Sequence, residues 1–217
     1  MTTILLIFIM KGFLITFEGI DFSGKSVQAK LLHEHLLQKE QPVLFLREPG
    51  GTEISEKIRE LLLDPKNQNM TSKTELLLYS AARSQMVLQK ILPHQKKGGI
   101  IICDRFYDST TAYQGYGRQI NLNFIKELNN FVTKGLVPDL TFLIDLEPKT
   151  ALKRNRLNHS SFDRLEQENL DFHHRVRRGY LEIAKCEEHR FVVVDGEQSV
   201  EKLQHQVLRE LKSKLQI

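Results

Sequence analysis

The stretch at residues 19–26 reads Gly19-Ile20-Asp21-Phe22-Ser23-Gly24-Lys25-Ser26, a complete G-x-x-x-x-G-K-S phosphate-binding loop. The two glycines allow a tight turn whose backbone N–H groups point inward, and the helix that follows adds the positive end of its dipole. Lys25 supplies a mobile charge for the β- and γ-phosphates, and the Ser26 hydroxyl can ligate Mg²⁺. An apolar, β-prone run precedes the loop and a helical pattern follows it. We therefore predict that residues 19–26 bind ATP or another nucleotide through its phosphates.

Length and composition are those of one soluble globular domain. The chain has 217 residues, of which 41% are hydrophobic and 27% are charged. A net charge of +4 suits a phosphate-rich ligand but is too small and too scattered to indicate nucleic-acid binding. Only Cys103 and Cys186 are present, which favours a reducing compartment, so we expect a cytoplasmic protein.

The first nine residues, MTTILLIFI, are apolar but lack the basic region and the cleavage site of a signal peptide. The run is too short to span a bilayer, and Lys11 and Gly12 interrupt it. We expect residues 1–9 to be an N-terminal extension or an upstream start, residues 10–217 to form a single domain, and no association with a membrane.

Strand-like apolar runs alternate with helical patterns along the chain. Strands are expected at 13–18, 43–46, 99–103, 140–145 and 191–194, and helices at about 24–39, 53–63, 73–96, 121–133, 148–157, 163–187 and 199–215. This alternation predicts a three-layer α/β fold in which helices flank a five-stranded parallel sheet, with right-handed crossovers.

A polar segment follows each predicted strand: the phosphate loop, then residues 47–52, 104–107, 145–148 and 195–196. Because ligands bind at the carboxyl ends of parallel strands, these segments should meet at one rim. Asp104 ends the third strand, where a carboxylate can hold the hydration shell of Mg²⁺, and Arg105 beside it would face phosphate.

Several motifs together resemble the bacterial thymidylate kinases. They occur in family order from about Lys11 to the C-terminus: Arg47-Glu48-Pro49-Gly50-Gly51-Thr52, Asp104-Arg105-Phe106, Ser109, Ala112-Tyr113-Gln114-Gly115, Gly117-Arg118 and Asp163-Arg164-Leu165-Glu166-Gln167-Glu168. The resemblance implies a P-loop nucleoside monophosphate kinase that transfers the γ-phosphoryl group of ATP to dTMP with Mg²⁺, giving dTDP. It also implies a homodimer.

By this resemblance, dTMP is held by side chains from several segments. Arg105 would bind the dTMP phosphate, Asp21 would lie near the sugar 3′-OH, and Tyr113 would crowd the sugar 2′ position. Tyr79, where the family often has Phe, would stack on the base, and Arg83 on the same helix face would bond a pyrimidine carbonyl. The other expected substrate-binding residues are Glu48, Pro49, Ser109, Thr110 and Gln114.

Residues 152–164, LKRNRLNHSSFDR, are basic and are predicted to form a lid that closes over ATP. An arginine from this lid would stabilise charge on the transferred phosphoryl group. Some family members carry a basic residue in the phosphate loop instead. This chain has Phe22 at that position. Phe22 is neither basic nor the glycine that is common in family members with a lid arginine. The lid is thus the expected source, and Arg154, Arg156 and Arg164 are all candidates.

Three other interpretations stay open on the sequence. A kinase for another nucleoside monophosphate, a deoxynucleoside or shikimate would use the same fold, although Tyr79, Arg83 and Arg47-Glu48-Pro49 favour dTMP. A regulatory GTP switch usually reads guanine with an N-K-x-D motif, which the sequence lacks. A nucleotide-binding module without catalysis is disfavoured by the intact Lys25, Ser26 and Asp104.

Overall fold

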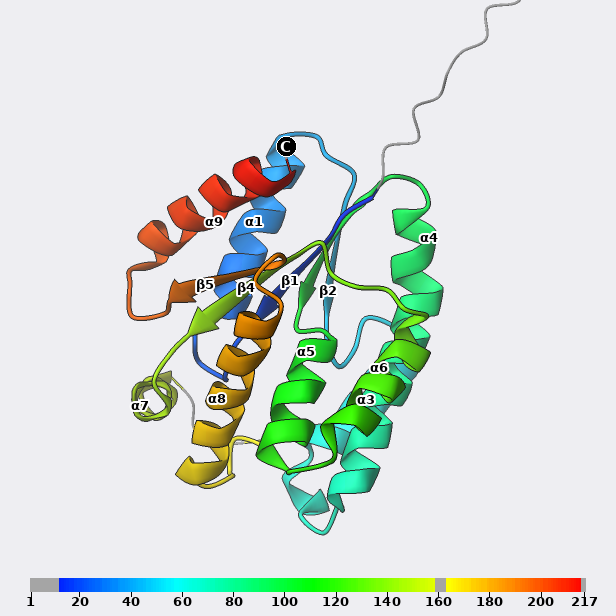
Figure 1. Ribbon diagram of the computed structural model, residues 1–217, viewed down its shortest axis with the longest axis vertical. Helices are drawn as coiled ribbons and strands as arrows, with labels where there is room; N and C mark the ends of the chain where they lie inside the picture. Colours follow the sequence, from blue (N-terminus) through cyan, green and yellow to red (C-terminus); the bar gives the residue numbers. More distant parts are fainter. Residues whose placement is uncertain (1–11, 159–162, 216–217) are drawn as a thin grey trace, which may run out of the picture.

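The protein is built around one parallel sheet, seen in a computed structural model that describes residues 12–158 and 163–215. The predicted extension at residues 1–9 lies outside these described residues. The strands are β1 (Leu14–Glu18), β2 (Val43–Arg47), β3 (Ile100–Asp104), β4 (Leu140–Asp145) and β5 (Phe191–Asp195), in the spatial order β2-β3-β1-β4-β5 (Figure 1). All four pairings are parallel, so the predicted α/β fold is confirmed, and each strand lies within one residue of its expected bounds.

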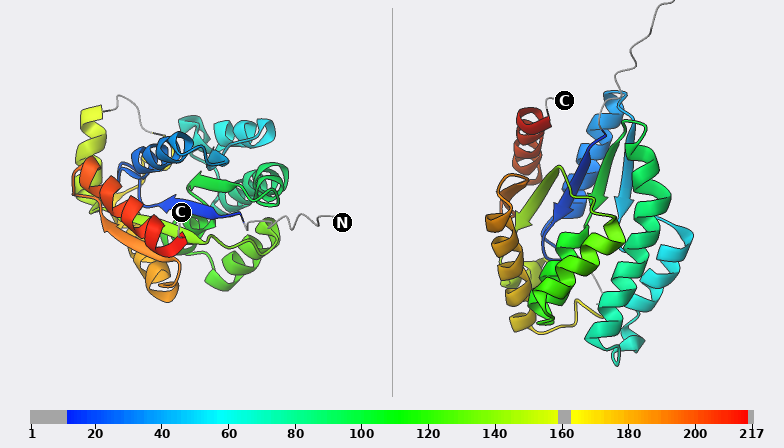
Figure 2. Two further views of the ribbon diagram at one scale, coloured as in Figure 1. Left: turned by 90° about the horizontal axis from the view of Figure 1, so that it is seen from above. Right: turned by 45° about the vertical axis from the view of Figure 1, so that its right-hand side comes forward.

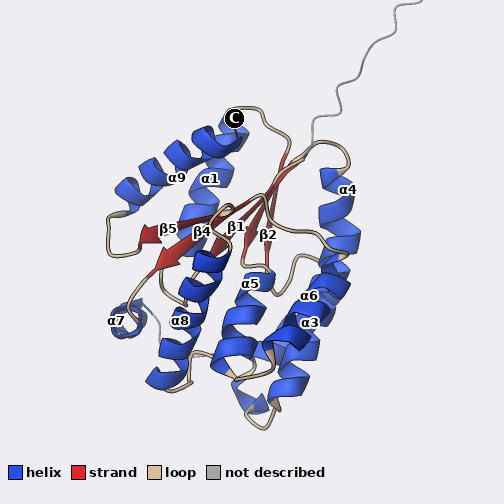
Figure 3. Ribbon diagram, in the orientation of Figure 1, coloured by secondary structure: helices blue, strands red, loops and turns tan. Residues whose placement is uncertain are grey.

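Helices connect the strands and cover the sheet on both sides (Figures 2 and 3). They are α1 (Lys25–Gln38), α2 (Glu53–Leu63), α3 (Ser72–Met86), α4 (Leu92–Gln95), α5 (Tyr107–Thr110), α6 (Leu122–Thr133), α7 (Pro148–Asn158), α8 (Leu170–Cys186) and α9 (Val200–Leu215). A short 3₁₀ turn, η1 (Pro65–Asn67), and two π-helical segments, η2 (Val87–Ile91) and η3 (Thr111–Gly117), complete the described elements.

Two helical expectations need correction. The helix expected at 163–187 begins only at Leu170, because Asp163 Oδ1 accepts the backbone N–H groups of Leu165 and Glu166 and holds a turn instead. The helical stretch α5–η3 was not predicted at all. Its glycines are weak helix formers, and packing decides here: a Cβ on Gly117 would meet Phe172 of α8 at 2.7 Å.

The core lies on both faces of the sheet. On one face, Ile15 and Phe17 of β1 pack with Leu32 of α1 and Val207 of α9, the two helices that lie side by side in Figure 1. Successive strand residues point to opposite faces, so Leu14 instead packs against Met86 and Val87 at the end of α3. A third cluster joins β4 to η3 and α8. Both faces are therefore covered, as continuous apolar strands require.

The carboxyl ends of β1, β3 and β4 open towards α5, α7 and the start of α1, and this rim carries the polar segments (Figure 1). Within the described part of the chain, none of the helices has both the length and the apolar character needed to cross a membrane.

Candidate active site

The phosphate loop joins β1 to α1 in the way that its sequence predicts. Gly19 has φ 139°, and a Cβ there would lie 2.5 Å from the carbonyl oxygen of Ile144, so only glycine fits. Gly24 has φ 99° and precedes α1, which has no side-chain cap and no acidic residue in its first turn. The first N–H groups of α1 therefore remain available to an anion.

Phe22 is the unusual member of the loop. Its φ of 62° lies in the left-handed region, which a glycine adopts freely and a phenylalanine adopts at a cost of about 1–2 kcal/mol. Its ring packs at the edge of the cluster formed by η3 and α8. This packing offsets the backbone cost and explains how the loop accommodates Phe22.

Three predicted phosphate and metal residues, Lys25, Ser26 and Asp104, line the same pocket. Lys25 is buried, and its Nζ lies 3.3 Å from the carbonyl oxygen of Ile20 and 3.5 Å from Asp21 Oδ1. Burial and the nearby charge of Arg105 lower the pKa of Lys25. Asp104 Oδ1 is buried without a hydrogen-bond partner among the described residues. A hydroxyl and an unpaired carboxylate oxygen at a phosphate site fit Mg²⁺, which prefers oxygen ligands.

A cavity of about 160 Å³, the central pocket, opens beside the phosphate loop. Its walls come from residues far apart in the sequence: Asp21, Lys25, Ser26, Arg47, Glu48, Pro49, Arg59, Leu63, Tyr79, Asp104, Arg105, Ser109, Thr110, Tyr113, Gln114, Asp163 and Leu165. All the predicted substrate-binding residues except Arg83 are in this set. The fold thus gathers them into one place, beside the predicted ATP site.

Asp21 and Arg105 join the two sites. Arg105 Nη2 donates to Asp21 Oδ1 at 2.5 Å and to the Tyr113 hydroxyl at 3.1 Å, and that hydroxyl donates to Asp21 Oδ2 at 2.9 Å. Burial opposes the ionised form of Asp21, but the charges of Arg105 and Lys25 prevail and lower its pKa. The backbone of Arg105 has φ 72°, in the strained left-handed region. This backbone conformation accompanies the side-chain position that contacts Asp21 and Tyr113.

Arg83 lies behind the pocket wall rather than in the pocket. Its side chain is only 1% exposed, its Nη2 lies 2.6 Å from Glu48 Oε2, and its Nη1 donates to Thr110 Oγ1 at 2.8 Å. Burial raises the pKa of Glu48 while Arg83 opposes that shift. Arg83 therefore contacts the pocket only indirectly, through the wall residues Glu48 and Thr110.

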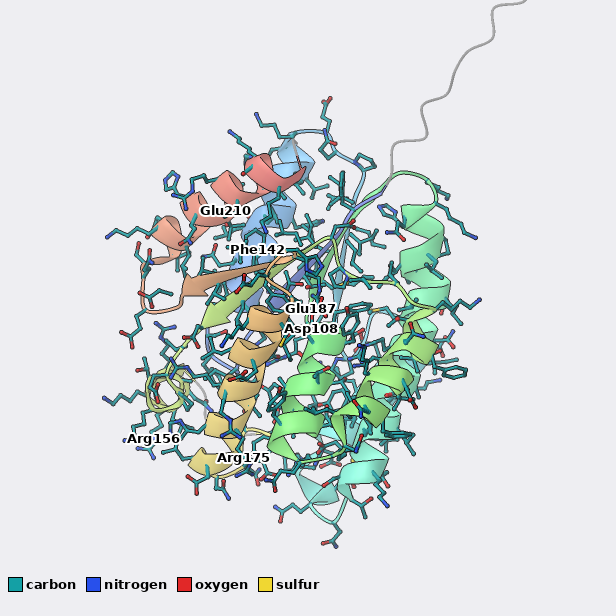
Figure 4. All side chains as sticks on the ribbon, in the orientation of Figure 1. Asp108, Phe142, Arg156, Arg175, Glu187 and Glu210 are labelled. Carbon is teal, nitrogen blue, oxygen red and sulfur yellow. The ribbon has the colours of Figure 1, made fainter. Side chains whose placement is uncertain are left out.

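The three candidate lid arginines occupy different environments. Arg154 on α7 donates to the carbonyl oxygens of Phe22 at 3.3 Å and Ser23 at 3.4 Å, directly beside the phosphate loop. Arg156 is exposed and lies on α7 at the outer edge in Figure 4. Arg164 is buried and lies 2.6 Å from Glu75. Within the predicted lid at 152–164, residues 152–158 are helical, and 159–162 lie outside the described residues.

Several site residues were missed by the sequence analysis. Arg47 and Arg59 line the central pocket as further cations, and Arg59 Nη1 donates to the carbonyl oxygen of Pro49 at 3.0 Å. Arg47 stands within the quoted 47–52 motif, which was a usable signal. Nothing local marks Arg59, or the fully buried Glu18 at the end of β1, because their importance comes from contacts distant in sequence.

Comparison with known proteins identifies the family of this chain. A model of the family described as thymidylate kinase matches residues 17–207. A thymidylate kinase of Caldanaerobacter subterraneus subsp. tengcongensis is 49% identical over 88% of this chain and 90% of its own length. One from Thermoanaerobacter sp. strain X514 is 45% identical over 95% of this chain and 100% of its own length.

A crystal structure of thymidylate kinase from Ehrlichia chaffeensis superposes with a TM-score of 0.77 at 37% identity, covering 93% of this chain and 98% of that one. Fold, phosphate loop and sequence relatives all agree. The chain belongs to the thymidylate kinase family and is an ATP-dependent nucleoside monophosphate kinase that phosphorylates dTMP to dTDP.

Proposed function

We propose that the phosphate loop, residues 19–26, holds ATP, that the central pocket holds dTMP, and that Arg105 binds the dTMP phosphate between them. The observation that carries this assignment is the 2.5 Å contact of Arg105 with Asp21, a residue of the phosphate loop that also lines the pocket. A cation at this junction sits where two anionic nucleotides must approach each other.

Mg²⁺ would be held by the Ser26 hydroxyl and, through water, by Asp104. The orphaned Oδ1 of Asp104 supports this role. When bound, the ion would offset the charge on the β- and γ-phosphates. Lys25 places its ammonium group on the same side, and its burial makes that charge more effective towards a phosphate than it would be in water.

The polarity of two pocket residues suits thymine. Thr110 Oγ1 accepts from Arg83, so its own proton is left for a ligand. Gln114 donates from Nε2 to Glu75 at 2.9 Å, which leaves its carbonyl oxygen as the end that accepts. A donor beside an acceptor complements a thymine carbonyl beside its N3–H group, whereas cytosine presents the opposite pattern.

Two aromatic rings and a carboxylate complete the nucleoside site. Tyr79 lines the pocket as an apolar face for stacking on the base. Tyr113 is held rigidly, since its hydroxyl is bonded to Asp21 and its ring packs edge-on against Phe172. A ring fixed in this way would crowd a 2′-hydroxyl, and Asp21 would lie near the 3′-OH.

Transfer of the phosphoryl group then needs the two nucleotides to be aligned and a positive charge to lie at the γ-phosphate. Among the three candidate arginines, Arg154 is the one that lies against the phosphate loop. Arg164 is committed to buried Glu75 and anchors the end of the proposed lid at Asp163–Glu168. We assign the catalytic contact to Arg154 and an anchoring role to Arg164, and direct in-line transfer follows.

A homodimer and a cytoplasmic location complete the proposal. The adjacent helices α2, α3 and α6, with the neighbouring η2, expose large apolar side chains, of which Phe131 is 79% exposed. The other exposed apolar side chains of these elements are Ile54, Leu61, Leu77, Leu88 and Phe124. Such a concentration of apolar surface suits burial against a second copy. The cytoplasmic location follows from the free cysteines Cys103 and Cys186.

The test is an ADP-release assay with Mg-ATP and a panel of acceptors: dTMP, dUMP, UMP, dCMP, AMP, GMP, thymidine and shikimate. We expect strong preference for dTMP and rejection of dCMP. Equal activity with dCMP would contradict the polarity assigned to Thr110 and Gln114, and equal activity with UMP would contradict the role of Tyr113.

A further inference from the structure

We propose that Glu18 is a positioning residue for Arg105, because its carboxylate takes the hydroxyl protons of Ser109 and Tyr180 and so turns their lone pairs towards the guanidinium. The proposal rests on the assignment of Arg105 to the dTMP phosphate made above. It concerns a residue that does not line the central pocket.

Glu18 lies at the carboxyl end of β1 and is 0% exposed. Its Oε1 accepts the backbone N–H of Phe106 at 2.7 Å. Its Oε2 accepts the Ser109 hydroxyl at 2.6 Å and the Tyr180 hydroxyl at 2.8 Å. One carboxylate thus binds the loop after β3, the short helix α5 and the long helix α8.

The number of protons fixes the direction of the next bonds. Each hydroxyl has a single proton, and Glu18 Oε2 is an acceptor for both. The two hydroxyl oxygens also lie 2.8 Å apart, so a proton shared between them stays on the side of Glu18 and away from Arg105. Arg105 Nη1, which lies 3.1 Å from Ser109 Oγ and 3.0 Å from the Tyr180 hydroxyl oxygen, therefore meets lone pairs. A guanidinium can only donate, so a hydroxyl proton turned towards it would repel it.

The same nitrogen also donates to the carbonyl oxygen of Gly19 at 2.9 Å, which cannot change its polarity. With Nη1 held on three acceptors, Nη2 points at Asp21 and the central pocket. Glu18 thereby orients the guanidinium of Arg105, which binds the acceptor phosphate, and it acts through the hydroxyl groups of Ser109 and Tyr180.

Glu18→Gln tests this chain of bonds with almost no change in shape. The new side chain has one oxygen and one NH₂ group, and the oxygen must stay on the Phe106 N–H, which is itself a donor. The NH₂ group then faces Ser109 and Tyr180, whose protons must turn away. One hydroxyl can donate to the other, 2.8 Å away, and the direction left to the remaining proton is towards Arg105.

We expect the Kd of dTMP, measured by calorimetry, to rise about five- to tenfold, as for loss of one ordinary hydrogen bond. The KM for dTMP should rise in parallel, while the KM for ATP stays within about twofold. An unchanged Kd for dTMP, or equal weakening of dTMP and ATP, would overturn the proposal.

Thr16→Val is the matched control. Thr16 lies two residues earlier on β1, is fully buried, and shares a 2.8 Å hydrogen bond with Thr141, whose hydroxyl also accepts from Arg190. Neither of these threonine hydroxyls is bonded to Glu18, Ser109, Tyr180 or Arg105. It should lower stability without changing the Kd of dTMP. If Thr16→Val weakens dTMP as much as Glu18→Gln does, the effect is general destabilisation and the proposal fails.

Two further variants keep the outcomes separate. Arg105→Ala tests the underlying assignment: if it leaves the Kd of dTMP unchanged, the proposed function is wrong at this residue. If it weakens dTMP and Glu18→Gln does not, the inference on Glu18 alone is wrong. Should Glu18→Gln fail to fold, Tyr180→Phe removes one acceptor from Arg105, and an unchanged Kd of dTMP there would equally refute the proposal.

Discussion

Asp21 Oδ1 lies 2.5 Å from Arg105 Nη2, an ion pair between residues 84 positions apart that ties the phosphate loop to the segment after β3. The strands that precede these residues, β1 and β3, are neighbours in the sheet. A shift of either segment must therefore move a charge in both nucleotide sites, so the two sites are mechanically joined.

Lys25→Met should lower kcat at least about 100-fold, because the variant keeps the apolar stem but removes a buried charge aimed at the phosphates. The measurement is steady-state turnover with saturating ATP and dTMP. Lys30→Met, an exposed lysine on the same helix, is the control and should change kcat less than about twofold. Near-normal turnover in Lys25→Met would contradict the assignment of the phosphate loop.

Arg154→Ala should lower kcat about tenfold or more, because Arg154 contacts backbone oxygens of the phosphate loop. The free energy of unfolding should fall by only about 1 kcal/mol, for the lost hydrogen bond to the carbonyl oxygen of Gly196. The exposed Arg156→Ala is its control on the same helix and should have normal kcat. Arg164→Ala should instead lower stability, since buried Glu75 loses one of its cations. A larger loss of kcat in Arg156→Ala would refute the choice of Arg154.

Arg83→Ala should destabilise the protein by about 3–5 kcal/mol, because it leaves Glu48 buried without its cation. Urea unfolding of the variant measures this loss. Weaker dTMP binding should accompany it, since Thr110 loses the donor that fixes its proton. Adding Glu48→Gln to Arg83→Ala should recover part of the stability, and no recovery would show that the buried ion pair is not the cause.

Phe131→Glu should convert the proposed homodimer into monomers, because a charge would be placed at the most exposed apolar side chain of the α2, α3 and α6 surface. Light scattering after size-exclusion chromatography gives the mass directly. Leu37→Glu, which alters an exposed leucine on α1 instead, should leave the mass unchanged. A monomeric wild-type protein would contradict the proposed dimer.

Wild-type stability relative to Glu18→Gln should fall as pH rises from about 5 to 8. Burial and the charge of Asp108 raise the pKa of Glu18 from 4.5 to about 7, so the folded protein holds this proton more tightly than the unfolded chain. The contribution of Glu18 is thus fully present below pH 4.5 and is lost as pH passes through about 7. The difference should change by up to about 3 kcal/mol.

Urea unfolding of both proteins at each pH measures that difference, and a constant difference would contradict the raised pKa. The other groups near Glu18 that titrate or carry charge are present in both proteins: Cys103, Asp108, Arg105, Lys25 and Tyr180. In our proposal, the ionised form of Glu18 positions Arg105. The folded protein is less stable when Glu18 is ionised, because a buried carboxylate then carries a charge.

The phosphate loop and the five strands can be predicted from residues that lie close together in the chain. The loop is recognisable because its chemistry needs two glycines, a lysine and a serine at fixed spacing within eight residues. The strands are recognisable because burial on both faces leaves a continuous apolar run, which is a local signal. The substrate-binding set also came from the sequence, but only through resemblance to a family.

The surroundings of those residues depend on contacts between segments that are far apart in the chain. It placed Arg83 behind the pocket against Glu48, and it separated Arg154 from Arg156 and Arg164. It also formed the helical stretch at 107–117 and brought Glu18 to Ser109 and Tyr180. In each case the deciding partners are distant in sequence, so no spacing or composition along the chain encodes the contact. The physical reason is that hydrogen-bond satisfaction of buried polar groups depends on which elements the sheet order β2-β3-β1-β4-β5 makes neighbours.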